Sequence, residues 1–380
     1  MDQADFEQIL GAVHDFVRKE VVPAEDEIEE TDAIPDRIRA KAAEMGLFGW
    51  ALPEEYGGLG LSMSEDVQLA MELGWTTPSF RSLLGTNNGI AGQVIVRHGT
   101  LKQKEFWLPR LAAGEAIASF ALTEPEAGSD PSGLRTTARR EGDSYVINGS
   151  KRFITNAPLA DLFVVFARTD PAATGTRGIS ALLVEADARG ITVGPPNHKM
   201  GQRGAWTAEL SFEDVRVPAS ALVGGEEETG FRAAMASLAR GRLHIGAMCV
   251  GMAQRLVAEM TSYIDTAEQG GAPISRFQLV QAQVAASYAE AFAGRSMVLA
   301  AAAAYDAGTD RKLGPSSAKL FCSEMVDRVA DRAVQVHGGT GYMHGTVVER
   351  CYRDARLFRI YEGTSEIQKL VIARALLAAG

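Results

Sequence analysis

The segment Ala121-Leu-Thr-Glu-Pro-Glu-Ala-Gly-Ser-Asp130 lies where the chain changes from a helical to an extended pattern, and it opens a β domain. The loop contains small residues, and Thr123, Gly128 and Ser129 bring side-chain or backbone donors close together. Such a loop lets a flat anionic or heteroaromatic ligand approach the backbone N–H groups. The alternative interpretation is a turn that binds no ligand.

The segments on either side of this loop are predicted to be helical. In residues 1–117, apolar side chains recur at helical spacing at Phe6, Ile9, Leu10, Val13 and Phe16. A second helix is expected from Ile34 to Gly46, since it begins near a proline and ends at a glycine. Residues 229–380 are alanine-rich and helical in pattern. Breaks in this last segment are expected at residues 270–273, 308–315 and 338–345.

Residues 118–228 are predicted to form an antiparallel β domain. They contain short runs rich in Val, Ile and Phe, separated by Gly, Pro and Asp. The predicted strands are Ser144–Ile147, Leu162–Ala167, Ile179–Val184 and Glu209–Phe212. The expected fold class is therefore α+β, with an N-terminal α-helical domain, a central antiparallel β domain and a C-terminal α domain that resembles a four-helix bundle.

The composition narrows the classes of protein. A net charge of −10 over 380 residues argues against a nucleic-acid binder, because phosphates are collected by a basic face. Three widely separated cysteines exclude a disulfide framework and a zinc cluster, and His337 and His344 lack a carboxylate partner at ligand spacing. We therefore expect no metal. The chain shows neither a secretory signal nor a membrane-spanning stretch, so no membrane association is expected and the cytoplasm is the default location.

A second stretch that could contain catalytic residues is Arg359-Ile-Tyr-Glu-Gly-Thr-Ser-Glu-Ile-Gln368. Glu362 lies between an aromatic residue and a glycine, and an apolar, tightly turned site would raise the pKa of its carboxyl group by desolvation. That makes Glu362 a candidate general base. The alternative is a carboxylate at the start of a helix, with Thr364 and Ser365 as its cap. In Lys151-Arg-Phe-Ile-Thr-Asn156, Phe153 could cover a ring and Thr155 could donate to it.

Taken together, these motifs resemble the acyl-CoA dehydrogenase family. The resemblance rests on 121–130 and 360–368, on Gln335-Val-His-Gly-Gly-Thr-Gly-Tyr342, on Lys199-Met-Gly-Gln-Arg-Gly204 and on Phe212-Glu-Asp-Val-Arg-Val-Pro218. It covers nearly the whole chain, with the motifs in the family's order and spacing.

The resemblance implies that the protein binds FAD. The loop residues implied to line the flavin are Phe120, Leu122, Thr123, Gly128 and Ser129, followed by Phe153, Ile154 and Thr155 beside the isoalloxazine ring. The residues implied to meet the FAD phosphates are Thr364, Ser365 and Glu366. In the family a neighbouring subunit completes each FAD site, here through Gln278, Gln335, Val336, His337, Gly338 and Gly339. A homotetramer is therefore implied.

The resemblance also implies a reaction. Glu362 would remove the α proton of an acyl-CoA thioester while a β hydride passes to flavin N5, which yields the trans-2-enoyl-CoA. The backbone amide of Glu362 and a ribityl hydroxyl would polarise the thioester carbonyl, and such donors contribute roughly 2.7–4 kcal/mol each. The residues implied to contact substrate are Ser129, Arg242, Tyr361 and Gly363. Electrons would leave to an electron-transfer flavoprotein.

Three positions, Ala267, Gly270 and Ala239, depart from the family pattern. Ala267 and Gly270 stand where an arginine and a phenylalanine usually reach the adenine end of the partner's FAD, so a heteromer with a sister chain remains an alternative. In that case the chain could be a structural partner subunit. Ala239 replaces a common aspartate beside the substrate arm, which keeps a carrier-protein-linked acyl group open; an acyl-CoA oxidase is a further alternative. Gly241 occupies the position where some relatives carry the base, which leaves that role to Glu362.

Overall fold

The N-terminal part of the chain is helical, as predicted. A computed structural model describes residues 1–378. The helices here are α1 (Gln3–Phe16), α2 (Glu25–Thr31), α3 (Asp36–Glu44), α4 (Met63–Leu73), α5 (Pro78–Asn88), α6 (Ile90–His98) and α7 (Leu101–Ala113). The sequence sets their ends locally: Ser62 with Glu65 forms a capping box at the start of α4, and Thr100 with Gln103 does the same at α7.

The middle of the chain forms a sheet of seven strands. They are β1 (Ala118–Ala121), β2 (Thr137–Glu141), β3 (Ser144–Thr155), β4 (Leu162–Arg168), β5 (Ile179–Glu185), β6 (Ile191–Val193) and β7 (Thr207–Pro218). The order is β1-β4-β2-β3-β7-β6, and β5 pairs with β4. All four predicted strands are confirmed within β3, β4, β5 and β7.

The prediction of antiparallel pairing needs one correction. The pairs β2–β3, β3–β7, β4–β5 and β6–β7 are antiparallel, but β1–β4 and β2–β4 are parallel. A parallel pair needs a long connection, because the chain must return to the edge from which it started. The loop at 121–130 with the β2–β3 hairpin provides that connection between β1 and β4. The expected domain remains mainly antiparallel.

The C-terminal part is a bundle built on one long helix. Its elements are α8 (Gly230–Thr266), the hairpin of β8 (Glu268–Gln269) and β9 (Ala272–Pro273), α9 (Gln278–Asp306), α10 (Leu313–His337), α11 (Val347–Ala355) and α12 (Ser365–Leu377). The predicted breaks at 270–273, 308–315 and 338–345 fall at the connections between α8, α9, α10 and α11, although α10 already begins at Leu313. The predicted order of helical, β and helical parts is therefore confirmed.

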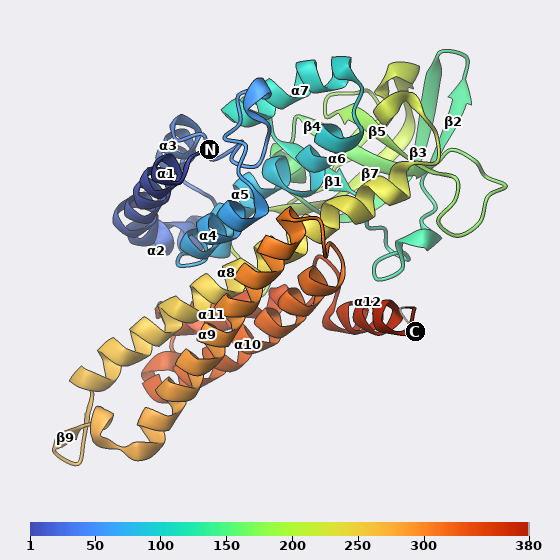
Figure 1. Cartoon of the computed structure of the whole chain (residues 1–380). Helices are drawn as coiled ribbons and strands as arrows, with labels where there is room; N and C mark the ends of the chain where they lie inside the picture. Colours follow the sequence, from blue (N-terminus) through green and yellow to red (C-terminus); the bar gives the residue numbers. More distant parts are fainter. Residues whose placement is uncertain (379–380) are drawn as a thin grey trace.

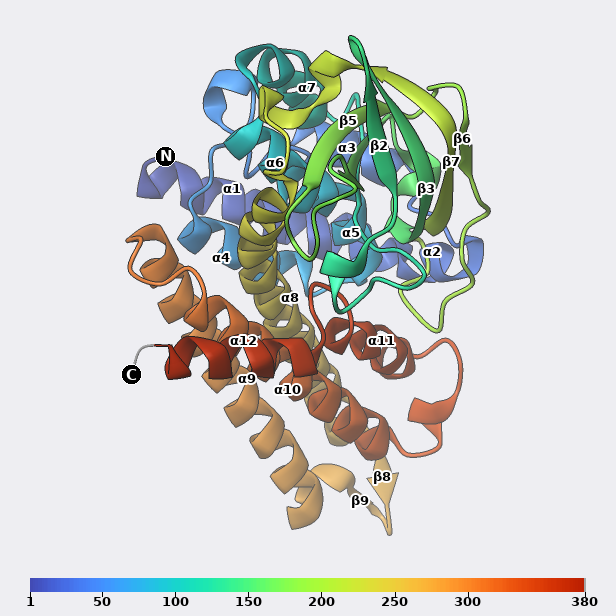
Figure 2. The same ribbon diagram turned by 90° about the vertical axis from the view of Figure 1, so that its right-hand side faces the viewer.

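Helix α8 connects the parts of the molecule. Figure 1 shows it running from the sheet through the N-terminal helices to the tip of the bundle, beside α9 and α10, and Figure 2 shows α12 crossing the bundle below the strands. Helix α8 crosses α4 closely, since a Cβ on Gly251 would lie 2.1 Å from the carbonyl oxygen of Met71 and one on Gly74 would lie 2.4 Å from that of Met248. Within residues 1–378, no helix is long and apolar enough to cross a membrane.

Candidate active site

A cavity of about 220 Å³ is enclosed by helices α5 and α8 and by the turn before α12. Strands β1 and β3, with the loop after β1, form its remaining wall. It brings together two motifs that lie far apart in the sequence. The predicted site residues that line it are Phe120, Leu122, Thr123, Gly128, Ser129, Phe153, Ile154, Thr155, Arg242, Tyr361, Glu362 and Gly363. The loop at 121–130 and the turn at 359–364 therefore face a common space.

The carboxylate of Glu362 is buried in this cavity, with its side chain 9% exposed. Its backbone is left-handed at φ 53°, and Oε2 has no hydrogen-bond partner within residues 1–378. Burial raises the pKa of Glu362, against the opposing charges of Arg81, Lys319 and Arg242. Left-handed backbone is costly for a residue other than glycine and concentrates at functional sites. Thr364 caps α12, as the helix-start alternative expected, but the helix begins at Ser365, so Glu362 itself lies outside it.

Two side chains hold the turn that carries Glu362. Lys319 Nζ donates to the carbonyl oxygen of Gly363 at 2.7 Å. Gln368 Nε2 donates to the carbonyl oxygens of Glu362 at 3.2 Å and of Gly363 at 2.9 Å. Burial lowers the pKa of Lys319 to about 8, so its ammonium group is charged at neutral pH. The turn is therefore fixed from α10 on one side and from α12 on the other.

Gly241 on α8 makes room for the carboxylate. A Cβ at this position would lie 1.9 Å from Oε2 of Glu362 and 2.8 Å from its Cδ. Two heavy atoms cannot approach so closely, so a side chain at 241 and the observed carboxylate of Glu362 exclude each other. The observed position of the Glu362 carboxylate therefore requires a glycine at residue 241.

Replacement of Gly241 by alanine is expected to displace the Glu362 carboxylate and to lower the activity. Misplacement by about 1 Å can cost roughly 10²-fold in rate, so we expect a loss of that order in kcat with little change in stability. Steady-state kinetics and a thermal melt check this. Gly246→Ala on the same helix is the matched control, because the nearest atom to its added Cβ would be 3.4 Å away. Equal activities of the two variants would contradict the steric account.

The opposite wall is built by β3 and by the loop after β1. Phe153 has φ 57° and is 56% exposed, and an added Cβ on Gly128 would meet no atom within 4 Å. Buried Glu124 fixes the loop, since it accepts hydrogen bonds from Lys151 Nζ at 2.7 Å and from the backbone N–H of Thr136 at 3.0 Å. An exposed ring beside an open, backbone-lined loop fits a flat heteroaromatic cofactor such as a flavin.

Some predicted site residues lie elsewhere. Gln278 begins α9, and residues 335–339 end α10, where Tyr263 stacks on His337 at 4.1 Å between ring centroids. None of these lines the cavity. An added Cβ on Gly338 or Gly339 would meet no atom within 4 Å, so a ligand could approach that backbone. Thr364, Ser365 and Glu366 form the start of α12, outside the cavity, where Ser365 Oγ donates to Glu324 at 2.6 Å. The cofactor roles of all these residues stay predictions.

The sequence interpretation missed the contribution of α5. Its buried face lines the cavity with Arg81, Ser82, Gly85 and Thr86. The other lining residues that were not predicted are Ile90, Pro131, Met235, Leu238 and Ile367. The sequence did contain one signal for α5, because Arg81 is the single charged residue in its sequence. The structure shows that every residue of this helix is buried.

Behind Gly241 lies a buried ionic cluster. Asp66 accepts from Trp50 Nε1 at 3.0 Å and contacts His244 Nδ1 at 2.8 Å through Oδ1, and its Oδ2 lies 2.8 Å from Arg240 Nη2. Burial by itself would raise the pKa of Asp66, but Arg240 and His244 lower it to about 2. Asp66 is therefore ionised, and both of its oxygens are already engaged.

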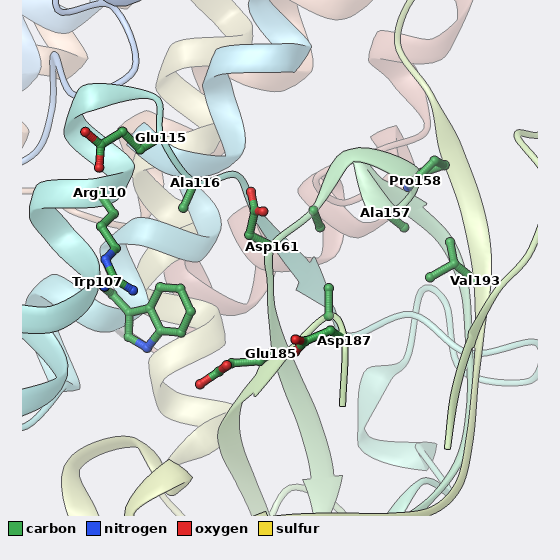
Figure 3. A pocket seen from close by; sticks show the side chains of 12 residues that line it. Trp107, Arg110, Glu115, Ala116, Ala157, Pro158, Asp161, Glu185, Asp187 and Val193 are labelled. Atoms are coloured by element: carbon green, nitrogen blue, oxygen red, sulfur yellow. The ribbon is translucent and has the colours of Figure 1, made fainter. Parts of the chain in front are cut away.

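A wider hollow of about 680 Å³ lies between α7 and the sheet. Figure 3 shows Trp107 and Arg110 on one side of it, with Asp161 and Glu185 among its carboxylates. No residue of the motifs at 121–130 or 359–368 lines this hollow, and its acidic groups disfavour an anionic ligand. The smaller cavity at Glu362 is therefore the better candidate for catalysis, although it has less volume.

Three family models match successive parts of the chain. The models for acyl-CoA dehydrogenase match residues 3–115 with the N-terminal domain, residues 119–215 with the middle domain and residues 228–377 with the C-terminal domain. The chain belongs to the acyl-CoA dehydrogenase family. This acyl-CoA dehydrogenase homologue is therefore an oxidoreductase that acts on CH–CH groups, and its expected FAD cofactor is confirmed as that of the family.

Known proteins of this family resemble the chain over nearly its whole length. A probable acyl-CoA dehydrogenase of Bacillus subtilis is 42% identical over 98% of this chain and 97% of the relative. Subunit CarC of the caffeyl-CoA reductase-Etf complex of Acetobacterium woodii is 39% identical over 97% of each chain. The structure of butyryl-CoA dehydrogenase from Megasphaera elsdenii is 34% identical, with a TM-score of 0.94 and 99% of each chain covered.

Proposed function

We propose that the protein catalyses the α,β-dehydrogenation of an acyl-CoA thioester to the trans-2-enoyl-CoA, with Glu362 as the base and an electron-transfer flavoprotein as the electron acceptor. The observation that carries this proposal is Glu362, which lines the same cavity as residues 153–155 and whose buried Oε2 has no hydrogen-bond partner among residues 1–378. A base must reach its proton within about 2.6–3.2 Å, directly or through one water. An acyl chain between Glu362 and that wall would meet this condition.

The residues of the chain divide the work. The bound flavin would accept a hydride from the β carbon when the α proton leaves. Glu362 takes that proton on its carboxylate, and the turn held by Lys319 and Gln368 keeps the carboxylate in position. The cation of Arg242, buried on α8, favours the negative charge that develops on the thioester oxygen. A bound flavin and acyl chain would exclude water from the cavity, which would strengthen each of these interactions.

The two electrons must leave before the next turnover. An electron-transfer flavoprotein is the proposed acceptor, and the likeness to the CarC subunit of a reductase-Etf complex supports it. That relative is named for the reverse reaction, which the same acid–base group can serve when electrons enter from the acceptor. The reduction potentials of the electron donor and acceptor therefore decide the direction of the reaction. Residues 153–155 and Glu362 would serve both directions.

The proposal is tested by anaerobic reduction of the purified protein's flavin. Butyryl-, octanoyl-, isobutyryl- and 3-phenylpropionyl-CoA are mixed with the oxidised protein, and the loss of flavin absorbance is followed. We expect rapid bleaching by at least one class of acyl-CoA. A flavin that no acyl-CoA of any class bleaches, but that dithionite does, would contradict the acyl-CoA dehydrogenase proposal.

A carrier-protein-linked acyl group is a second candidate substrate. The observation that favours it is Ala239, which stands on α8 where an aspartate commonly holds the substrate arm. Acyl groups on phosphopantetheinylated carrier protein and on CoA are compared in the bleaching assay. Faster bleaching by the carrier-bound form would favour this candidate, and it would also direct attention to the surface around the cavity mouth. An oxidase stays a weaker alternative, and oxygen consumption without an added acceptor tests it.

We also propose a homotetramer in which a neighbouring chain completes each FAD site. Apolar side chains exposed along α9 support an interface there, namely Leu279, Tyr288 and Phe292. The open backbone at Gly338 and Gly339 supports contact with a partner's cofactor. Solution mass with the flavin-to-protein ratio tests this. A lone homotetramer with a full flavin complement excludes the heteromer suggested by Ala267 and Gly270; a colourless chain would favour a structural partner subunit.

The pH dependence of catalysis is expected to report Glu362. Burial raises the pKa of this carboxyl group, and a base works only when it is ionised. The value of kcat/KM should therefore rise with pH through an apparent pKa above the ordinary glutamate value of about 4.3. Initial rates from about pH 4 upward measure this limb. A limb at or below the ordinary glutamate pKa would contradict the assignment, and the residual rate of Glu362→Gln should lack the limb.

A further inference from the structure

Gln202 is a buried residue with an unusual backbone, and it lies outside the cavity. It is 1% exposed, and its φ of 53° is left-handed. Such a conformation is costly for a residue other than glycine and persists only where the surrounding structure enforces it. Here the backbone N–H of Gln202 donates to Oδ1 of Asp354, and Gln202 Nε2 donates to the backbone carbonyl oxygen of Asp354 at 3.1 Å. Helix α11 therefore holds Gln202 through both its backbone and its side chain.

Asp354 lies in the last turn of α11 and is 2% exposed. The segment 199–204 lies directly against it, since an added Cβ on Gly201 would be 2.6 Å from Oδ1 of Asp354 and 2.7 Å from the backbone carbonyl carbon of Arg353. Arg353 Nη1 also donates to the carbonyl oxygen of Met200 at 3.2 Å. A side chain at 201 would break this contact, so the close approach of the segment to α11 requires a glycine there.

The chain that follows Gln202 leads to the proposed flavin wall. The carbonyl oxygen of Trp206 accepts a hydrogen bond from the N–H of Asn156 at 2.8 Å, and β7 begins at the next residue, opposite the end of β3. Trp206 Nε1 donates to the carbonyl oxygen of Asp32 at 2.5 Å, which ties the segment to the end of α2 as well. Since the stretch between Gln202 and β7 is short and hydrogen-bonded, a shift of Gln202 is passed on to the end of the wall.

The chain that follows Asp354 leads to the proposed base. Helix α11 ends one residue later, and one 3₁₀ turn (Arg356–Arg359) precedes the segment that carries Tyr361 and Glu362. Gln202 lies beside the hydroxyl group of Tyr361, which lines the cavity. The contact between Gln202 and Asp354 therefore joins the stretch that leads to the flavin wall with the stretch that leads to the base.

We propose that Asp354 is a positioning residue, which through Gln202 sets the distance between the Glu362 carboxylate and the proposed flavin wall at 153–155. This inference rests on the proposed dehydrogenation at Glu362. Asp354 does not line the cavity, so it acts on the reaction by placement and not by contact with substrate. Placement matters when a proton and a hydride leave neighbouring carbons, since a misplacement of about 1 Å can cost roughly 10²-fold in rate.

The strength of this contact is expected to change near neutral pH. Burial raises the pKa of Asp354 to about 7, against the hydrogen bond from Gln202. The charged or titratable groups that face Asp354 come from α2, from α11 and from the segment 199–204, and they are Glu29, Arg350, Cys351, Arg353 and Lys199. A hydrogen bond to an ionised acceptor is roughly twice as strong as one to a neutral acceptor. The contact is therefore stronger above about pH 7, where the carboxylate is ionised, and weaker below it.

The isosteric variant Asp354→Asn tests the charge in the FAD-loaded protein. At about pH 8 the wild-type carboxylate is ionised, so the variant replaces a charged acceptor by a neutral one. The probe is whichever of butyryl-, octanoyl-, isobutyryl- and 3-phenylpropionyl-CoA bleaches the wild-type flavin fastest. We expect flavin reduction by the saturating probe to slow about tenfold, while calorimetric affinity for the probe and reduction by dithionite stay unchanged. An unchanged rate, or a loss of affinity equal to the loss of rate, overturns the inference.

The pH profile separates positioning from support of the fold. The ratio of the wild-type rate to the Asp354→Asn rate cancels the titration of Glu362, which both proteins share. We expect this ratio to rise with pH through about 7, as the wild-type carboxylate ionises. Asp15→Asn, on the exposed surface of α1, is the matched control and should give a ratio near one at every pH. A ratio of wild type to Asp354→Asn that does not change with pH overturns the inference.

Gly201→Ala breaks the same contact from the other side. Its methyl group would overlap Oδ1 of Asp354 and push the segment 199–204 away from α11. We expect kcat to fall roughly 10²-fold and KM to change little. Gly194→Ala is the matched control, because its added Cβ would be 3.4 Å from the nearest atom. Thermal melts and flavin content show whether each variant folds. A folded Gly201→Ala variant with the wild-type kcat overturns the inference, and Asp354→Asn alone decides if that variant does not fold.

The inference and the proposed reaction fail separately. If an acyl-CoA bleaches the flavin of the wild type and of Asp354→Asn at the same rate, the dehydrogenation stands and the positioning role fails. If no acyl-CoA bleaches the wild-type flavin, the proposed reaction fails, and the absorption spectrum of the bound oxidised flavin decides on Asp354. A spectral shift near pH 7 that the wild type shows and Asp354→Asn lacks supports the link to the flavin wall. A wild-type spectrum without that shift overturns it.

Discussion

Glu362→Gln is expected to reduce the rate of flavin reduction by about 10²–10⁴-fold, the usual contribution of a positioned general base. Glutamine has nearly the same shape and can occupy the space beside Gly241, but its amide cannot accept the α proton. The variant should therefore fold, keep its FAD and bind acyl-CoA. Rapid mixing with a substrate that reduces the wild-type flavin measures the rate directly. A variant that reduces its flavin within threefold of the wild-type rate (roughly 0.65 kcal/mol) would assign the base to another group.

Two companion variants make the first prediction specific. Glu362→Asp keeps the carboxylate but withdraws it by one methylene, so a rate between those of the wild type and the glutamine variant is expected. Glu7→Gln makes the same chemical change on the exposed surface of α1 and should leave the rate unchanged. If Glu362→Asp were as slow as Glu362→Gln, placement of the carboxylate would matter as much as its charge.

Asp66→Ala is expected to destabilise the protein by about 3–5 kcal/mol, because it leaves Arg240 as a buried charge without its partner. Trp50 and His244 would lose their hydrogen-bond acceptor as well. The free energy of unfolding by urea or guanidinium chloride, or the thermal midpoint where unfolding is irreversible, measures the loss. A change below about 1 kcal/mol would mean that water or a neighbouring group replaces the carboxylate.

The acid side of the stability curve offers an independent check. The folded-state pKa of Asp66 is about 2, below the ordinary aspartate value of 3.8, so its contribution is present above 3.8 and is lost as the pH falls toward 2. Asp66→Ala should remove this part of the acid sensitivity. Asp15→Ala is the matched control, since Asp15 pairs with Lys19 on the surface at 60% exposure and such a pair contributes at most about 0.5 kcal/mol.

The fold could be predicted well where the hydrophobic pattern is periodic and less well where it is short or polar. Helix α1 follows from apolar residues at helical spacing, and strands β4 and β5 follow from short, almost continuous apolar runs. Strand β2 has the sequence Thr-Ala-Arg-Arg-Glu, with exposed charges, and its place depends on pairing with β3. The parallel pairing of β1 with β4 depends on how the connection crosses the sheet, and local sequence does not encode that path.

The candidate site could be predicted from its loops and not from its helices. Thr123, Phe153 and Glu362 each lie in a short contiguous motif, and such a motif can be recognised in the sequence. Arg81 and Ser82 lie in a buried helix, and the direction in which a helix presents each residue depends on how it packs against its neighbours. The contact between Gly241 and Glu362 joins residues distant in the chain, so it appears only when α8 and the turn before α12 are both in place.

The close crossing of α4 and α8 at Gly74 and Gly251 has a consequence for tuning this enzyme. The proposed base is carried by the C-terminal bundle, whereas the proposed flavin wall is carried by the sheet, and α8 packs against both. A larger residue at the crossing would push α8 away from α4 and change the angle of α8 to the sheet. The gap between base and flavin would then widen or narrow although neither had been altered. Turnover can therefore be adjusted from a place that no substrate atom ever reaches.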